Sequence, residues 1–305
     1  IIAAVGFTAV GTNVIAAAIA KSFDEGRGLA TGIGTSGATA GQLCVVPLAA
    51  ALMQSVSWRY GYGALAVCAL VLAIAAFVLL PRKAASSAHA VQRVSIARGT
   101  WALMKVPAFH VLFWSFFICG FTTSGVIETH FLPYASFCGF PPLPSATAYG
   151  VLSAVNLAGM VLAGHLTDRV HRPLLLGSIY IIRALSFILL LYVAPDIRLL
   201  YLFVVLFGLV DYSTLPVTVG LAVSHLGVER IGLAMGLIAG GHALGGAAGA
   251  LAGGLLFDAS GAYAWLWIGS IALSLFAGLL VFTLRDRPVS PEAILPSSGT
   301  AVPAE

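Results

Sequence analysis

The stretch GLATGIGTSGATAG, residues 28–41, contains five glycines in fourteen residues. Three of them, Gly32, Gly34 and Gly37, match the G-x-G-x-x-G pattern with which dinucleotide-binding enzymes hold a pyrophosphate. Such a site needs a strand before the glycines and an acidic residue about 20 residues after them. Here a charged segment, residues 21–25, precedes the glycines, and no Asp or Glu occurs between Glu25 and Glu128. The sequence therefore argues against a cofactor site and requires another physical reason for these glycines.

The composition places the whole chain in a lipid environment. Of its 305 residues, 60% are hydrophobic and 9% are charged, and the mean hydropathy is +1.01. Soluble domains carry about 25% charged residues. The apolar runs are long enough to cross a bilayer, and backbone groups in lipid must bond to one another, so the runs are helices. We predict an all-α integral membrane protein with nine spans: 1–20, 28–54, 60–80, 108–131, 146–166, 174–194, 199–222, 231–257 and 262–284.

The basic residues predict how these spans are oriented. If the loop 21–27 is cytoplasmic and the spans alternate, twelve basic residues lie inside and only Arg59 and Arg198 lie outside. Cytoplasmic loops of membrane proteins carry such an excess of Lys and Arg. We therefore predict a multi-pass protein of the bacterial inner membrane with a cytoplasmic C-terminus. The net charge of +4 is spread over the loops, and we expect no nucleic-acid partner.

An internal repeat relates the second predicted span to the eighth. Residues 25–32, EGRGLATG, return as residues 229–236, ERIGLAMG, and at the same offset Gly37 matches Gly241 and Gly41 matches Gly245. The two spans are six helices apart. Because six is an even number, the two copies run in the same direction. Parallel repeats of six helices are typical of the two halves of major facilitator transporters.

A loop motif carries the same resemblance. Residues 164–172, GHLTDRVHR, resemble the G-x-L-x-D-R-x-x-R signature of the major facilitator superfamily through Gly164, Asp168, Arg169 and Arg172. The resemblance implies a twelve-helix fold with two pseudo-symmetric halves, in which this loop joins helices 8 and 9. The nine spans would then be helices 4–12 of an N-terminally truncated chain. It also implies that these four residues act as a conformational latch on the cytoplasmic side.

The resemblance divides the chain into four parts. They are a partial N-terminal half with helices 4–6 (1–80), a cytoplasmic central loop (81–107), a C-terminal half with helices 7–12 (108–286) and a disordered tail (287–305). Residues 30–33 and 35–37 look most similar to the monocarboxylate-transporter branch and its bacterial relatives. Mammalian members of that branch carry Asp and Arg in helix 8 for proton and anion binding. Asn156 and Met160 occupy those positions here, so the resemblance does not extend to that site.

The function implied is secondary active transport of a small solute by alternating access. We expect a small organic anion as substrate, a proton as the coupling ion and the lipid bilayer as the surroundings, with no cofactor, no metal and no enzymatic activity. An exporter of hydrophobic compounds is an alternative. A rhomboid-like serine protease is another, because Ser36 lies in a G-x-S-G pattern and His242 in H-x-x-G-x-x-x-G. The repeat places these two residues on opposite flanks, whereas a nucleophile needs its base within hydrogen-bond reach.

The glycines have a packing explanation. Small residues recur every four positions in both copies of the repeat, and such ridges let helix backbones approach closely in a membrane. The predicted packing residues are Gly28, Gly32, Gly37 and Gly41 in one copy and Gly241, Gly245, Gly249 and Gly253 in the other. We expect the first ridge to meet Gly150, Ala154 and Ala158 of the span 146–166. We expect the second to face helix 2, which this sequence does not contain.

Polar residues at membrane depth are the candidates for the substrate and ion pathway. Asp211 and Arg183 lie at depths that differ by only about 3 Å, given the 1.5 Å rise per residue of a helix. Asp211 is therefore either a structural partner of Arg183 or a substrate or proton site. We expect Thr122 and Thr123 to lie in a broken segment before Glu128 and Pro216 to bend its helix. The full set of pathway candidates is Asp211, Arg183, Glu128, His242, Asn13, Gln42, Asn156, Thr122 and Thr123.

Overall fold

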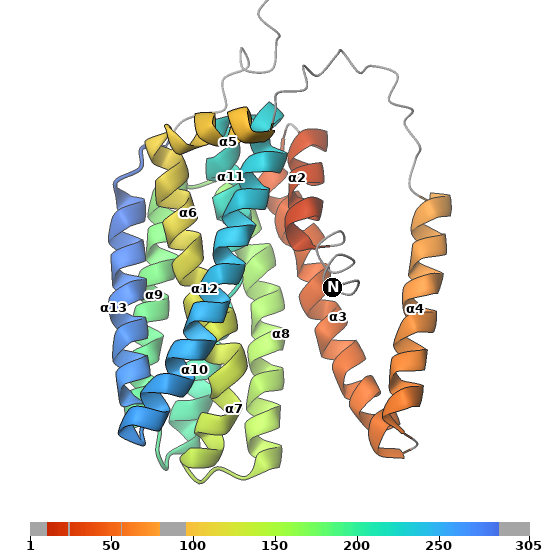
Figure 1. Ribbon diagram of the computed structural model, residues 1–305, viewed down its shortest axis with the longest axis vertical. Coiled ribbons are helices and arrows are strands. Elements are labelled where there is room, and N and C mark those ends of the chain that lie inside the picture. The colour runs from red at the N-terminus through yellow and green to blue at the C-terminus, as the bar shows by residue number, and fades with distance from the viewer. Residues whose placement is uncertain (1–10, 24, 56, 80–95, 287–305) are drawn as a thin grey trace, which may run out of the picture.

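The computed structural model of the protein describes residues 11–23, 25–55, 57–79 and 96–286 (Figure 1). Every regular element in these ranges is a helix. Six helical segments are long and apolar enough to cross a membrane: Pro107–Phe137, Leu143–Thr167, Arg172–Tyr192, Ile197–Leu226, Val228–Ser260 and Ala264–Phe282. The all-helical membrane fold is thereby confirmed. The count of nine spans and the division into twelve-helix halves stay predictions.

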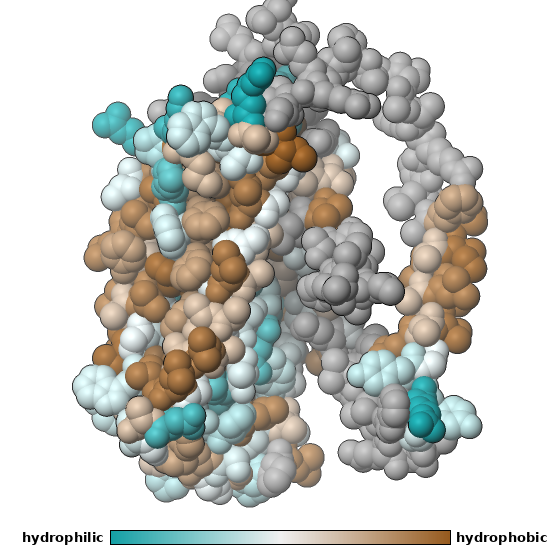
Figure 2. All heavy atoms as spheres, in the orientation of Figure 1, coloured by the Kyte–Doolittle hydropathy of each residue, from teal (hydrophilic) through white to brown (hydrophobic). Residues whose placement is uncertain are grey.

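Three helices form the N-terminal part of the described chain: α2 (Thr12–Ser22), α3 (Arg27–Ser55) and α4 (Trp58–Leu79). Helix α3 lies between α2, α4 and the C-terminal bundle, where it packs against α8. Helix α4 stands apart from that bundle in Figure 1. Its apolar side chains, such as Leu70, Leu72 and Phe77, are exposed, as the brown surface in Figure 2 shows. Apolar exposure of this extent is suited to lipid or to further helices, not to water.

The C-terminal bundle contains the remaining helices. The first span is built from α6 (Pro107–Gly120), the π-helical segment η1 (Phe121–Ile127) and α7 (Glu128–Phe137), and the short α5 (Ile96–Met104) precedes it. The others follow in chain order: α8 (Pro142–Thr167), α9 (Arg172–Tyr192), α10 (Ile197–Val210), α11 (Thr214–Leu226), η2 (Val228–Arg230), α12 (Ile231–Ser260) and α13 (Ala264–Phe282).

Two spans of this bundle are irregular near their middle. The predicted span 199–222 consists of two helices, α10 and α11, separated by residues 211–213. Pro216 explains the position of this break, because its ring clashes with the carbonyl group four residues earlier, that of Tyr212. The expected bend is therefore a full interruption. In the span 107–137, the segment around Thr122 and Thr123 is a π-helix, a form that is often found at functional sites.

Helices α3 and α8 touch through glycines at one end only. A Cβ atom added to Gly28 would lie 2.5 Å from the carbonyl oxygen of Gly164, and one added to Gly32 would lie 2.6 Å from that of Met160. By contrast, no atom lies within 4 Å of the Cβ positions of Gly37, Gly41 and Gly150. The two helices diverge away from the Gly28 end in Figure 1. The predicted packing of this ridge against the span 146–166 is therefore confirmed at Gly28 and Gly32 and wrong at Gly37, Gly41 and Gly150.

The second glycine ridge packs inside the bundle. Cβ atoms at Gly245 and Gly249 would collide with the carbonyl oxygens of Phe117 and Phe121, and one at Gly253 would collide with the ring of His130. Nearer the start of α12, a Cβ at Gly241 would lie 2.7 Å from the ring of Phe113. The ridge thus covers the span 107–137 and not an additional helix, so the predicted partner of these glycines is wrong. The small residues allow this close contact between helix backbones.

The contrast between Gly32 and Gly37 gives a matched test. Gly32→Ala places a methyl group against the backbone of α8, and overpacking of this kind costs about 1–3 kcal/mol. Gly37→Ala adds the same methyl group in open space on the same helix, so it carries the same gain in helix propensity. We expect the thermal unfolding midpoint in detergent to be lower for Gly32→Ala than for Gly37→Ala. Equal midpoints would contradict the close α3–α8 contact.

Candidate functional site

Arg183, on α9, is fully buried and joins three helical spans. Its Nη1 donates to the hydroxyl groups of Thr122 and Thr123 at 3.2 and 3.1 Å and to Cys119 Sγ at 3.1 Å. These acceptors all lie at the junction of α6 and the π-helical segment η1. A buried cation is tolerated only where such acceptors surround it. This junction therefore supplies the acceptors for Nη1 of the guanidinium group.

The acceptors for Nη2 come from the break between α10 and α11, while Nε is buried without a hydrogen-bond partner among the described residues. Nη2 of Arg183 donates to the carbonyl oxygen of Val210 at 2.8 Å and to that of Asp211. Carbonyl groups at the end of a helix lack intrahelical partners, so the arginine replaces the bonds that the break removed. The prediction that Arg183 and Asp211 lie at matching depths is consistent with this contact. The contact is made with the backbone, and the structure shows no ion pair between the guanidinium and the Asp211 carboxylate.

Asn156, on α8, binds two consecutive residues of the break. It is 3% exposed, its Nδ2 donates to Asp211 Oδ2 at 3.4 Å, and its Oδ1 accepts from the backbone N–H of Tyr212 at 3.2 Å. The hydroxyl group of Tyr212 donates to Glu128 Oε1 at 2.6 Å. These bonds place Glu128, Asn156 and Asp211 in one polar cluster. Sequence analysis did not select Tyr212, although its position four residues before Pro216 marks it as part of the break.

The remaining pathway candidates lie outside this cluster or outside the described side chains. The ring of His242 packs against Phe116 with centroids 4.8 Å apart, and its Nε2 has no hydrogen-bond partner. Ser36 donates to the carbonyl oxygen of Ile33 on its own helix, so the serine and histidine of a rhomboid-like site are not brought together. The side chains of Asn13 and Gln42 are not among those that the structure describes.

The loop motif contacts α3 through one aspartate. Asp168 accepts hydrogen bonds from the backbone N–H of Gly28 at Oδ1 (2.7 Å) and from that of Leu29 at Oδ2 (2.9 Å). A carboxylate at this position satisfies two unpaired donors at the start of α3 and interacts favourably with the helix dipole. We call the end of the molecule that holds this contact the latch end. The contact joins segments that are 140 residues apart in the chain.

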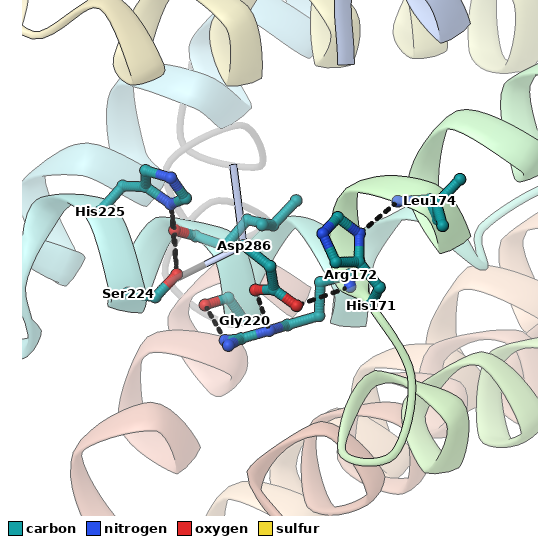
Figure 3. A network of polar contacts seen from close by, with 8 residues as sticks. His171, Arg172, Leu174, Gly220, Ser224, His225 and Asp286 are labelled. Carbon is teal, nitrogen blue, oxygen red and sulfur yellow. Dashed lines mark hydrogen bonds and ion pairs between the residues drawn. The ribbon is translucent and has the colours of Figure 1, made fainter. Parts of the chain in front are cut away.

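The arginines of the motif do not contribute to this cap. Arg172 Nε forms an ion pair with Asp286 Oδ1 at 3.0 Å, and Nη1 donates to the carbonyl oxygen of Gly220 at 3.3 Å, as Figure 3 shows. The side chain of Arg169 is exposed and makes no hydrogen bond or ion pair with any described residue, whereas its backbone N–H donates to the carbonyl oxygen of Leu166. The predicted joint action of the four motif residues is therefore corrected in part. Asp168 binds backbone N–H groups of α3, and Arg172 fastens the loop to the end of the C-terminal bundle.

Comparison with known proteins decides the family. Residues 1–208 and, in a second overlapping match, residues 157–303 match the family described as Major Facilitator Superfamily. The chain belongs to the Major Facilitator Superfamily. It is 31% identical over 254 residues to the uncharacterized MFS-type transporter YcxA of Bacillus subtilis (strain 168). That match covers 79% of this chain and 60% of the relative, so the chain spans less than two thirds of the relative's length.

Membership of the Major Facilitator Superfamily agrees with the class of protein that the structure indicates, an all-helical membrane protein. The family consists of membrane transporters, and the apolar helices fit a multi-pass membrane protein. The motif that suggested the family is also the loop that caps α3 in the structure. The relative's name says nothing about a substrate.

Arg183→Lys tests whether the forked guanidinium holds the central cluster together. A lysine keeps the charge but cannot bond to both η1 and the α10–α11 break, because it lacks the planar fork of arginine. We expect a loss of about 2–4 kcal/mol in stability, seen as a lower thermal unfolding midpoint in detergent. Arg198→Lys is the control, since Arg198 is an exposed arginine on a neighbouring helix. An equally small effect of both substitutions would refute the bridging role.

Asp168→Asn tests the cap on α3. Asparagine keeps one acceptor but loses the charge and the second acceptor, and removal of a helix cap costs about 0.5–2 kcal/mol. We expect amide hydrogen exchange at residues 28–29 to become about fivefold faster. Asp196→Asn is the matched control, because Asp196 caps the start of α10 by accepting from Arg198 N at 2.8 Å. Unchanged exchange at residues 28–29 would show that the carboxylate does not hold this helix end.

Proposed function

We propose that the protein is a secondary active transporter that moves a small organic anion together with a proton by alternating access. The observation that carries the proposal is the polar cluster of Glu128, Asn156, Asp211 and Tyr212 around a broken helix within an apolar bundle. Non-helical backbone at membrane depth is tolerated only where protein buries it or where it lines a cavity. In transporters, such broken helices form the sites for substrates and coupling ions.

Asp211 is the proposed proton carrier. It is 3% exposed, Oδ2 accepts from Asn156, and Oδ1 has no hydrogen-bond partner in the structure. A carboxyl group that moves a proton has to be accommodated in both its charged and its neutral form. Arg183, bonded to the adjacent carbonyl group, stabilises the charged form, and the unoccupied Oδ1 leaves room for the proton. Asp211 therefore has the surroundings that a reversible proton site needs.

The charge of the cluster links the proton to an anion. Arg183 is the cation at membrane depth in the described spans, and Asp211 lies next to it. When Asp211 binds a proton, the cluster becomes more positive by one charge, so an anion is repelled less and attracted more. A proton and a small anion would then enter together. The similarity of residues 30–33 and 35–37 to the monocarboxylate branch is the ground for choosing a carboxylate as that anion, and binding would use Arg183 and Asp211 in place of the helix 8 Asp and Arg that this chain lacks.

The one-sided contact between α3 and α8 supports alternating access. The two helices are joined at the latch end by Asp168 and by the Gly28–Gly164 contact, they still touch at Thr39 and Met160, and they separate toward the other end of α3 in Figure 1. We place the latch end in the cytoplasm, as the distribution of basic residues predicts. The conformation is then closed toward the cytoplasm and open toward the outside. Reversal would require the Asp168 cap to break, and a few hydrogen bonds can form and break at small net cost.

Asp211→Asn tests the proton coupling. The amide is close to the neutral acid in shape but cannot exchange a proton, so net uptake should lose its dependence on an imposed pH gradient while exchange of internal for external substrate continues. The measurement is uptake of labelled lactate, pyruvate, acetate and succinate by proteoliposomes that contain the whole protein. Asp258→Asn, at an exposed carboxyl group on α12, is the control. Wild-type gradient-driven uptake by Asp211→Asn would exclude Asp211 as the proton carrier.

A further inference from the structure

Glu128, at the start of α7, is the exposed carboxyl group of the central polar cluster. Asn156 and Asp211 are each 3% exposed. At 1.5 Å per residue, Glu128 lies about 14 Å from Phe137, where its span ends, and Asp211 lies about 21 Å from Ile197, where its span begins. Both span ends are opposite the latch end (Figure 1). Glu128 is therefore about 7 Å nearer than Asp211 to that side of the bundle.

The carboxylate of Glu128 is held in place but only half used. Its Oε1 accepts from the hydroxyl group of Tyr212 at 2.6 Å, and Tyr212 adjoins Asp211 in the chain. Among the described residues, none donates to Oε2 and none forms an ion pair with Glu128. The charges of Glu128 and Asp211 interact, and both act on the hydroxyl group of Tyr149 on α8. Glu128 thus presents a fixed negative charge and an unused acceptor beside the buried carboxyl group.

The buried carboxyl group also lacks a partner. Oδ1 of Asp211 makes no hydrogen bond with any residue in the described part of the chain. A buried polar atom that is left unpaired costs free energy, so a solute that bonds to Oδ1 would remove this cost. A solute that reaches Oδ1 from the side opposite the latch end has to pass Glu128. Its far end would then lie beside the Glu128 carboxylate.

We propose that Glu128 determines which anions the protein accepts, favouring monocarboxylates with a hydrogen-bond donor at the far end and rejecting dicarboxylates. The inference rests on the proposed function, in which the carboxylate of the substrate binds beside Arg183 and Asp211. A second carboxylate at the far end meets Glu128, and the contact of like charges suppresses binding of the wrong partner. A hydroxyl group at the same place donates to Oε2. A methyl group does neither.

Three acids of equal chain length test this selectivity: 4-hydroxybutyrate, butyrate and succinate, which end in a hydroxyl group, a methyl group and a second carboxylate. The thermal unfolding midpoint of the whole protein in detergent is titrated with each acid at equal ionic strength, at a pH where succinate is doubly charged. We expect the wild type to bind 4-hydroxybutyrate at least about threefold more tightly than butyrate, and succinate at least about tenfold more weakly than butyrate.

The variant Glu128→Gln keeps the size of the side chain and removes its charge. We expect the affinity for succinate relative to butyrate to rise at least about tenfold in this variant, because the repulsion is lost. Glu128→Asp keeps the charge and should keep the wild-type order of the three acids. Glu229→Gln is the matched control, because Glu229 is an exposed glutamate in η2, at the other end of the bundle. It should match the wild type for all three acids.

The results separate the role of Glu128 from the anion site itself. If all three acids bind and Glu128→Gln leaves the ratio of succinate to butyrate affinity unchanged, Glu128 does not select the substrate, while the proposed anion site stands. A wild type that prefers succinate to butyrate overturns the inference in the same way. If no acid stabilises the wild type or the variants, the proposed anion site is absent, and the role of Glu128 is refuted with it.

Discussion

The burial of Arg183 is the constraint on which the centre of the molecule depends. A guanidinium group that is fully buried in an apolar bundle is stable only if polar acceptors surround it. Regular helices offer none, because their carbonyl groups are already bonded. The π-helical segment at Thr122 and the break at Asp211 provide the missing acceptors from two different spans. The two irregular segments and the arginine therefore stabilise one another, and none of the three is favourable alone.

Contacts at glycine residues determine how the helices around this cluster pack. Lipid gives no hydrophobic reason for helices to associate, so close van der Waals contact between backbones has to supply the attraction. Helix α12 packs against the span 107–137 in this way from Gly241 to Gly253. Helix α3 meets the backbone of α8 only at Gly28 and Gly32 and touches α8 further along through side chains, as Thr39 Oγ1 does at 3.6 Å from Met160 Sδ. The backbone contact between α3 and α8 is thus shorter than that between α12 and the span 107–137.

The sequence predicted elements better than it predicted partners. Apolar runs located the described spans, and the rise per residue placed Arg183 and Asp211 at one depth, because both depend on local chain geometry. The partner of Arg183 could not be predicted, because every residue has a backbone carbonyl group and the residue type does not show which one accepts a hydrogen bond. The ridge at Gly245 was assigned to the wrong helix for a related reason: a small residue shows that something approaches but does not identify what. Sequence analysis missed Tyr212 because its role depends on the break between α10 and α11.

Helix α8 connects the latch to the central cluster. It runs without interruption from Pro142 to Thr167, so Asn156 and Gly164 lie on one rigid element about 12 Å apart. A Cβ at Gly208 of α10 would lie 2.7 Å from the carbonyl oxygen of Leu152, which shows that α8 and α10 are in backbone contact. These two helices are therefore packed as one unit, and in the proposed alternating access the motion would occur where α8 meets α3. Release of the latch would then shift α8, and with it the amide group that holds Asp211.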